Sequence, residues 1–473
     1  MIKSAICRLL PFALLLIAGC TPNPLIHDGS EAAIDRSTRK TQADGHALRT
    51  SDIDFSRIFE EDPAPRETGF IIEPVTPVHS MRHPSFRVRK RPIRVMLRRD
   101  LREIAVSSGG TVQIRAAGAN MTFNGRANFE AGAGSGAVIV SANNARREMR
   151  LPCTLFVSGG GRGRAGQITI GENTYRGALI FASEGGNNFS IINLIAVEDY
   201  IRGVVPLEIG NLREPDIEAL KVQAIAARTY AYKRMAANER RLFDVVATVA
   251  DQVYGGANAE GEVPDRAILL TQDLIMVYDN QIVGAFYHST CGGKTANIED
   301  VWGGGPFPYL RSIDDVDASG KAFCAGSNTF AWTETWSDSQ LAGILRRYSS
   351  EGNLQPPFSG SLRGMEVRER FECGRVKTLA ITSSGNREHT TGGDRTRFLI
   401  RRPTRAQPIL RSSNIGDITF AGGQVTITGN GHGHGIGMCQ VGAIARARAG
   451  HNFDQILQAY YSGVAIRTVI DDR

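Results

Sequence analysis

Short apolar segments separated by glycine-rich turns dominate the chain between about residues 91 and 197. Brief runs rich in Val, Ile and Thr, bounded by glycine clusters, are typical of β-strands. The pattern therefore predicts a β-sheet or a small barrel-like region, with strands at 94–97, 104–106, 111–114, 137–140, 167–170 and 190–197.

Residues 215–240 carry the clearest helical signal. From Ile217 to Ala231, apolar residues recur every three or four positions, which predicts a long amphipathic helix with one apolar face. Pro215 is suited to the first helical turn, because its missing amide hydrogen has no helical partner there.

Strand and helix patterns alternate after this helix. A short polar turn joins apolar segments in a predicted hairpin, and further strands and one short helix follow. The overall prediction is an α+β fold, in which a glycine-rich β-strand region is followed by an α+β domain. The predicted segments are the hairpin at 275–278 and 282–286, strands at 379–382 and 424–427, and a helix at 454–460.

The first twenty residues predict export. Lys3 and Arg8 flank the start of an apolar run at 9–17, which is too short to span a bilayer and is typical of a cleaved signal. The run closes with Ile17-Ala18-Gly19-Cys20, a bacterial lipobox pattern in which Cys20 is lipidated. An ordinary signal peptide with a coincidental cysteine is the alternative. We expect residues 1–19 to be removed and the protein to be lipid-anchored to the cell envelope, in the periplasm or at the outer membrane of a diderm.

Residues 20–90 are predicted to be a disordered tether. The stretch from Cys20 to Val88 holds seven prolines and few aromatic residues, so it cannot bury enough apolar surface to offset chain entropy. A coil of this length has a root-mean-square reach of roughly 45 Å. The anchored protein could therefore work at a distance from its membrane.

Composition narrows the classes of function. With 42% hydrophobic residues among 473, the chain can form a real core, which excludes a wholly disordered, collagen-like or coiled-coil protein. The formal net charge of +7 suits anionic partners such as acidic glycans or lipids. Nucleic acid is not expected as a partner, because the sequence has no nucleic-acid-binding module and binding would conflict with export.

Four segments concentrate residues that could carry chemistry. They are 197–208, with the sequence VEDYIRGVVPLE, the helical AARTY at 226–230, YHSTCGG at 287–293, and GHGHGIGMCQ at 431–440.

In this order the four segments resemble the SpoIID/LytB family of cell-wall proteins, with the third continuing into Asp300-Val301-Trp302-Gly303. The resemblance covers roughly residues 91–473. It implies a catalytic core at 190–473 preceded by a β-rich N-terminal part at 91–189. It also implies a lytic transglycosylase that cleaves MurNAc–GlcNAc bonds in peptidoglycan strands stripped of peptide, with an amidase as an upstream partner. The alternative is a non-catalytic, glycan-binding amidase enhancer.

Glu208 matches the catalytic acid of this family. A partly protonated Glu can protonate the leaving oxygen, and the same carboxylate can then accept the proton of the sugar's own 6-hydroxyl to give a 1,6-anhydro end. Ordinary glycosidases need a second carboxylate. We expect Glu208 at an apolar strand-to-loop exit with a raised pKa, and Asp199 as a cap of the turn that follows it. A solvated or helix-capping Glu is the alternative.

The resemblance also implies substrate-binding residues. Arg228 lies on the inward helix face and needs an anionic partner, either the lactyl carboxylate of MurNAc, Glu208, or a purely structural carboxylate. Glycine neighbours would bring the glycan close to the backbone at His434, where the ring would touch the sugar or orient Glu208. His432 departs from the family pattern and is expected in an exposed loop. The full predicted set is Arg228, Tyr287, His288, Ser289, His434, Gly435, Met438 and Gln440.

No cofactor or metal is expected. His432 and His434 could ligate zinc, but a third ligand is missing nearby. Some relatives in the family bind zinc, so a metal site near His288 and Cys291 is the lesser alternative. We expect a disulfide between Cys291 and Cys324 instead, whose loop closure would contribute ~3–4 kcal/mol. Cys439 stands where the family usually has Ser, which places a thiol beside the site.

Overall fold

The computed structural model describes residues 83–132, 136–158, 167–184 and 187–472. The predicted signal peptide, Cys20 and nearly all of the predicted tether lie outside the described residues. Strands and helices are mixed, so the α+β prediction is confirmed. No helix in the described ranges is both long and apolar enough to cross a membrane.

The first half of the described chain forms an eleven-stranded sheet. Its main path runs β12-β2-β11-β10-β7-β3-β4-β5-β6; off this path, β8 pairs with β3, and β9 pairs with β8. Phe181 stacks between Phe129 and Phe189 at ring-centroid distances of 4.5 and 5.5 Å, which fills the core against this sheet. The strands are β2 (Ile93–Leu101), β3 (Glu103–Ala116), β4 (Ala119–Ala131), β5 (Ala137–Ala142), β6 (Ala145–Arg150), β7 (Cys153–Ser158), β8 (Ile168–Ile170), β9 (Asn173–Tyr175), β10 (Ala178–Ser183), β11 (Phe189–Ile195) and β12 (Val245–Val246).

A second sheet joins the two ends of the described chain. Its order is β1 (Ser85–Val88), β23 (Ala465–Asp471), β13 (Leu274–Tyr278) and β14 (Gln281–Ile282), and β1 runs parallel to β23. The predicted hairpin is present: Asp279 and Asn280 have φ values of 47° and 55°, as a two-residue turn with both residues left-handed requires. Its second strand is shorter than predicted, since β14 ends at Ile282.

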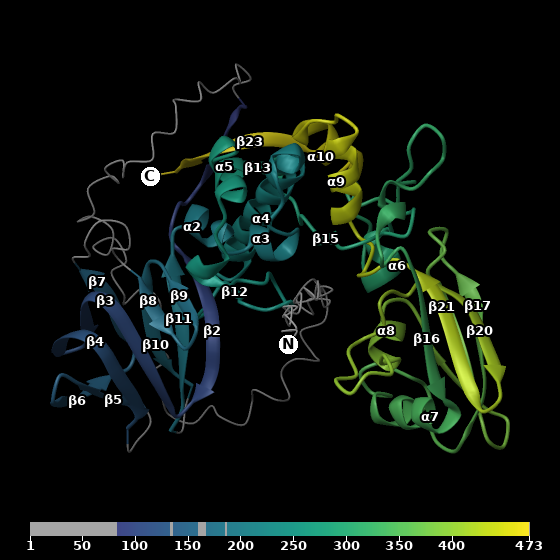
Figure 1. The fold of residues 1–473 in the computed structure, drawn as a ribbon, viewed down its shortest axis with the longest axis horizontal. Coiled ribbons are helices and arrows are strands. Elements are labelled where there is room, and N and C mark those ends of the chain that lie inside the picture. Colours follow the sequence, from purple (N-terminus) through teal and green to yellow (C-terminus); the bar gives the residue numbers. More distant parts are fainter. Residues whose placement is uncertain (1–82, 133–135, 159–166, 185–186, 473) are drawn as a thin grey trace, which may run out of the picture.

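The long helix α4 (Ile217–Ala237) lies at the centre of the molecule (Figure 1) and follows a 3₁₀ turn, η4 (Glu214–Asp216). The prediction of a single apolar face was wrong. Side chains on all sides of α4 are buried, including Gln223 and Arg228, because α5 (Glu262–Leu270), α9 (Gln440–Arg448), α10 (Phe453–Tyr460) and β13 pack around it. Its many alanines allow this close approach from several directions.

Two short helices connect β11 to α4. They are α2 (Val197–Arg202) and α3 (Val205–Glu208), with Pro206 in the first turn of α3. Glu208 therefore ends a helix rather than a strand, which corrects the predicted strand-to-loop exit. Asp199 caps nothing; it lies inside the first turn of α2, with its carboxylate 3.4 Å from Arg202.

The segment between Cys324 and Gly431 forms an additional lobe with its own core around Trp336, Leu379 and Ile427 (right-hand side of Figure 1). It contains two three-stranded sheets, β16-β21-β20 and β17-β18-β19. Its elements are β16 (Ala331–Ser337), α7 (Asp338–Arg347), β17 (Leu362–Arg370), β18 (Val376–Ser383), β19 (Arg387–Thr391), α8 (Arg395–Leu399), β20 (Ile415–Ala421) and β21 (Gln424–Asn430).

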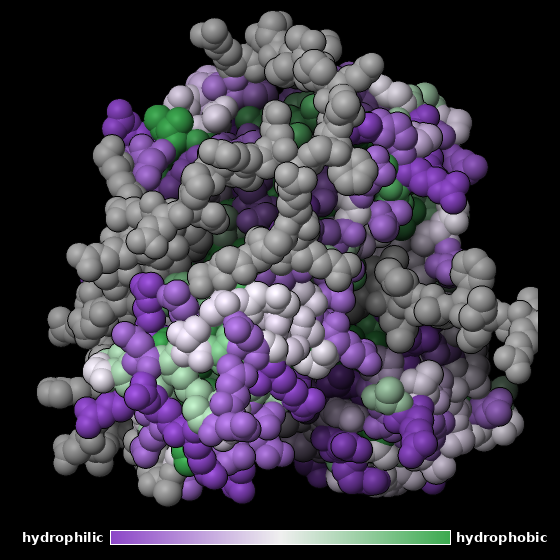
Figure 2. All heavy atoms as spheres, turned by 60° about the vertical axis from the view of Figure 1, so that its left-hand side comes forward, coloured by the Kyte–Doolittle hydropathy of each residue, from purple (hydrophilic) through white to green (hydrophobic). Residues whose placement is uncertain are grey.

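The chain returns from this lobe through β22 (Met438–Cys439), which pairs in parallel with β15 (Tyr287–His288). This pair brings the third and fourth sequence motifs together beside α4. The remaining short elements are η5 (Gly256–Ala259), α6 (Ile298–Trp302) and η6 (Phe323–Gly326). On the face drawn in Figure 2, hydrophilic residues cover most of the coloured surface and hydrophobic residues form only small patches.

Candidate functional site

Glu208, the last residue of α3, is a buried carboxyl group with 7% of its surface exposed. Its Oε1 accepts a hydrogen bond from the backbone amide of Val253 at 2.7 Å, and the side chain of Gln440 also hydrogen-bonds to it. Burial raises the pKa of Glu208 to about 7, and these two hydrogen bonds oppose part of the shift by favouring the ionised form. The carboxyl can therefore exist in both protonation states near neutral pH, as a group that donates and later accepts a proton must.

Gln440 connects this carboxyl to the central helix. It is the first residue of α9, and its Nε2 donates to Oε1 of Gln223 on α4 at 3.2 Å. The preceding residue, Cys439, is the N-cap of α9, and its sulfur accepts from the amide of Gly442 at 3.3 Å. Of the predicted substrate-binding residues, Gln440 is the one that hydrogen-bonds Glu208 in the structure.

The residue before Val253, Gln252, is held in place by two hydrogen bonds of its side chain. Gln252 accepts from the hydroxyl of Tyr200 at 3.2 Å and donates to the hydroxyl of Tyr287 at 3.0 Å. The segment ends in a tight turn at Gly256, which has a φ of +65° and where a Cβ would lie 2.3 Å from the carbonyl oxygen of Thr174. Gln223, Gln252 and Val253 were not predicted from the sequence. For Gln252 and Val253, the one local signal of a special loop was the glycine pair that follows at 255–256.

His434 is bound to backbone on both sides and has only 1% of its surface exposed. The amide of Ile436 donates to Nδ1 and Nε2 donates to the carbonyl of Tyr287, both at 3.0 Å, so the ring is a neutral imidazole with its proton on Nε2. Burial holds its pKa well below the usual range. The prediction that His434 touches the sugar or orients Glu208 does not match this geometry: the ring fastens β15 to the loop before β22.

The other predicted binding residues around β15 and β22 also form buried support. Tyr287, His288, Ser289 and Met438 are all buried, and Nδ1 of His288 lies 3.1 Å from the carbonyl oxygen of Ile436. Gly435 has a φ of +87°, and a Cβ there would lie 2.4 Å from the guanidinium of Arg375. The absence of a side chain at Gly435 thus accommodates Arg375.

Arg228 is fully buried in a structural ion pair. Its Nε and Nη2 lie 2.7 and 2.8 Å from the two carboxylate oxygens of Glu198, and its Nη1 donates to the carbonyl of Leu274 at 3.0 Å. Of the three anionic partners considered from sequence, the structural carboxylate is the one found. The predicted substrate-binding role of Arg228 is therefore not supported, because with 0% exposure it cannot meet a sugar in this structure.

The predicted disulfide is absent from the structure. Cys291 and Cys324 are free thiols whose sulfur atoms lie 3.4 Å apart, next to Cys439 and Asp315. His432 is half-buried rather than exposed, because its backbone exchanges two hydrogen bonds with Thr290, at 3.0 and 2.8 Å. The group of potential metal ligands that the described residues bring together contains neither His432 nor His434.

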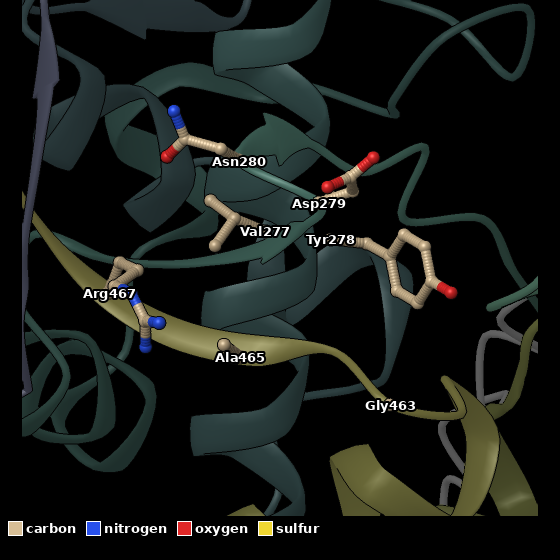
Figure 3. Close-up of a pocket in the computed structure, with 7 residues that line it drawn as sticks. All are labelled: Val277, Tyr278, Asp279, Asn280, Gly463, Ala465 and Arg467. Carbon is tan, nitrogen blue, oxygen red and sulfur yellow. The ribbon is translucent and has the colours of Figure 1, made fainter.

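A separate hollow of about 430 Å³ lies at the β13–β14 hairpin beside β23 (Figure 3). None of its lining residues was predicted from sequence for the site, and Glu208 is not among them. They are Val277, Tyr278, Asp279, Asn280, Gly463, Ala465 and Arg467.

Two family models match the chain. Residues 185–278 match SpoIID, the stage II sporulation protein family, and this stretch contains α2, α3 and α4 with Glu208. Residues 319–437 match a domain of unknown function, DUF8618, which corresponds to the additional lobe.

Individual relatives extend the similarity. An uncharacterized protein of Brachyspira hyodysenteriae is 30% identical over 302 residues, which are 63% of this chain and 74% of the relative. The stage II sporulation protein D of Bacillus amyloliquefaciens is 28% identical over 295 residues, which are 59% of this chain and 76% of the relative. The amidase enhancer of Bacillus subtilis is 27% identical over 301 residues, which are 56% of this chain but only 40% of that protein.

Proposed function

Since the chain belongs to the SpoIID family, we propose that it is a peptidoglycan lytic transglycosylase with Glu208 as general acid and base. Membership of the family supports a role at the cell wall. The substrate in this proposal is the MurNAc–GlcNAc bond of glycan strands, and the products carry 1,6-anhydro ends.

The observation that carries the proposal is the environment of Glu208. A carboxyl with a pKa of about 7 is substantially protonated at neutral pH and can donate its proton to the glycosidic oxygen as the bond to C1 breaks. The 6-hydroxyl of the same MurNAc then attacks C1, and the Glu208 carboxylate accepts the hydroxyl proton. The carboxyl is restored and no water is consumed.

The partners of Glu208 suit a mechanism with one carboxyl group. Its hydrogen bonds come from a backbone amide and from an uncharged side chain, those of Val253 and Gln440. Hydrolytic glycosidases place a second carboxylate across the scissile bond as nucleophile or base, a task that the sugar hydroxyl performs here. The two amide donors orient the carboxyl and remain in place through both proton transfers.

We further propose that the protein is exported and held at the envelope through lipid on Cys20, with residues 20–90 as the tether. The lipobox Ile17-Ala18-Gly19-Cys20 supports this part of the proposal. Replacement of Cys20 by Ser is expected to move the protein from the membrane fraction to the soluble fraction on cell fractionation.

A second candidate is a protein that binds glycan and stimulates an amidase without cleaving glycan itself. The relative named amidase enhancer favours it. Digestion of peptide-free glycan strands, followed by mass analysis, separates the two candidates. Anhydro ends support the transglycosylase, whereas intact strands together with faster amidase turnover support the enhancer.

A further inference from the structure

Four buried side chains from separate parts of the chain lie close together, and one of them, Cys439, directly precedes Gln440. Cys291 follows β15, Asp315 and Cys324 belong to the segment that leads into the additional lobe, and Cys439 is the N-cap of α9. One ligand atom from each residue lies within 4.8 Å of all the others. Two contacts are closer: Sγ of Cys291 lies 3.4 Å from Sγ of Cys324 and 3.4 Å from Oδ2 of Asp315.

We propose that these residues hold one zinc ion through three thiolates and one carboxylate oxygen. Zinc in structural sites takes four protein ligands in a tetrahedron, with Zn–S distances near 2.3 Å, so its ligand atoms are separated by roughly 3.5–3.8 Å. The 3.4 Å contacts and the 4.8 Å upper bound bracket these separations. The ion could therefore be bound with small shifts of the side chains.

Backbone amides already point at the sulfur atoms. Gly293 donates to Sγ of Cys291 at 3.3 Å, and both Cys291 and Gly442 donate to Sγ of Cys439, at 3.2 and 3.3 Å. Such bonds stabilise thiolates, the form in which cysteine binds a metal. The N-terminus of α9 adds a favourable dipole beside Cys439.

The two carboxylate oxygens of Asp315 have different partners. Its Oδ2 faces Cys291, while its Oδ1 accepts from the guanidinium of Arg446 at 2.9 and 3.1 Å. The hydroxyl of Tyr460 lies 3.0 and 2.9 Å from the two oxygens. Contacts of this kind orient a ligating carboxylate, and Arg446 offsets part of the negative charge that three thiolates and a carboxylate leave around a divalent ion.

The convergence of three sulfur atoms favours a metal over a disulfide. A bond between Cys291 and Cys324 would use two thiols and leave out the Cys439 sulfur and the Asp315 oxygen that lie beside them. With all four ligands supplied by protein, the site would be closed and structural rather than catalytic. It would fasten the exit of β15 and the segment around Cys324 to the start of α9, directly before Gln440.

The proposed metal site does not depend on the proposed transglycosylase activity. Only the idea that the metal helps to position Gln440 beside the catalytic Glu208 rests on that activity. The first measurement is therefore metal content. The full chain, purified without chelator and dialysed, is expected to carry about one zinc per molecule by elemental mass spectrometry. Cys324→Ser should lose most of it, whereas Cys153→Ser, at a buried cysteine in β7 outside the cluster, should keep it.

Cobalt provides a second readout that does not require a variant to fold. Cobalt-substituted wild type should show tetrahedral d–d bands and thiolate charge-transfer absorption, and stripping zinc should lower the melting temperature of wild type and Cys153→Ser equally. The proposal would be overturned in favour of the disulfide if the protein held no metal and peptide mapping without reduction found the Cys291 and Cys324 peptides joined. The joined peptides would have a mass two hydrogens lower than the sum of the two thiol peptides. Zinc retained at full stoichiometry by a folded Cys324→Ser variant would also overturn it.

Discussion

Gln440 joins Gln223 across the interface between α9 and α4, with Nε2 3.2 Å from Oε1. The same side chain of Gln440 hydrogen-bonds the carboxylate of Glu208. Two residues 217 positions apart in sequence thus set the position of the donor that favours the ionised form of the proposed catalytic acid.

Replacement of Gln440 by Leu is expected to raise the pKa of Glu208 further, because a hydrogen bond to the ionised form is lost. Such a bond to a charged group is worth about 1.5–3 kcal/mol, so the alkaline limb of the activity profile should move up by about one pH unit or more. The pH dependence of anhydro-end release measures this shift. Gln424→Leu, at an exposed position of β21, is the control and should leave the limb in place.

Replacement of Glu208 by Gln should lower glycan cleavage by about 10²-fold or more, since the amide cannot transfer the proton. The fold and glycan binding should persist, because Gln keeps the size and can still accept from the Val253 amide. Release of anhydro ends from peptide-free strands is the measurement. Glu366→Gln, at an exposed position of β17, should retain full activity. Turnover above about a tenth of wild type in Glu208→Gln would place the acid elsewhere.

The raised pKa of Glu208 also predicts how stability changes with pH. Below about pH 4.5 the carboxyl is protonated in both the folded and unfolded chain, so it has no effect on the difference between them. As pH rises toward 7, the unfolded chain releases the proton while the folded protein retains it, so the free energy of unfolding falls. A shift from 4.5 to about 7 corresponds to about 3 kcal/mol.

Glu208→Gln, which cannot ionise, is therefore expected to be more stable than wild type at pH 8, by up to about 3 kcal/mol. The two proteins should have equal stability near pH 4. Urea denaturation at both pH values tests this difference. Equal stability at pH 8 would contradict a buried Glu208 with a raised pKa.

The Glu198–Arg228 pair is predicted to act on stability. Glu198→Ala leaves the fully buried guanidinium of Arg228 without its carboxylate and should cost about 3–5 kcal/mol. Addition of Arg228→Met should recover part of that loss, because no buried charge then remains. Asp199→Asn, next in the chain and partly exposed, should change stability by less than about 1 kcal/mol. KM for glycan should stay unchanged in the double variant if it folds, and a large rise in KM would restore a binding role to Arg228.

The sequence predicted those elements whose residues are neighbours along the chain. The α4 helix, the Asp279–Asn280 turn and five strands of the first sheet, β2, β3, β5, β8 and β11, follow from local periodicity and turn chemistry. The predicted strands at 104–106 and 111–114 form the single strand β3, and the other strands of this sheet were not predicted. The additional lobe was not recognised as a separate unit, although its strands at 379–382 and 424–427 were predicted. Its boundaries carry no local signal that distinguishes them from other turns.

Contacts between distant residues were harder to predict. The motif identified Glu208 and Gln440, but not that Val253 and Gln223 would complete their hydrogen bonds. Arg228 and His434 are motif residues as well, yet burial gives them backbone or carboxylate partners in place of substrate. A motif thus marks residues that the fold brings together without saying which of them face the ligand.

The parallel pairing of β1 with β23 has a mechanical consequence for a protein proposed to be anchored by its N-terminus. Any pull on the chain ahead of Ser85 acts first on the four residue pairs of this ladder, from Ser85–Thr468 to Val88–Asp471. A pull along the strand loads these pairs together in shear and does not peel them open one at a time. Strand β23 would therefore be the attachment through which tension from the membrane reaches the domain that contains Glu208.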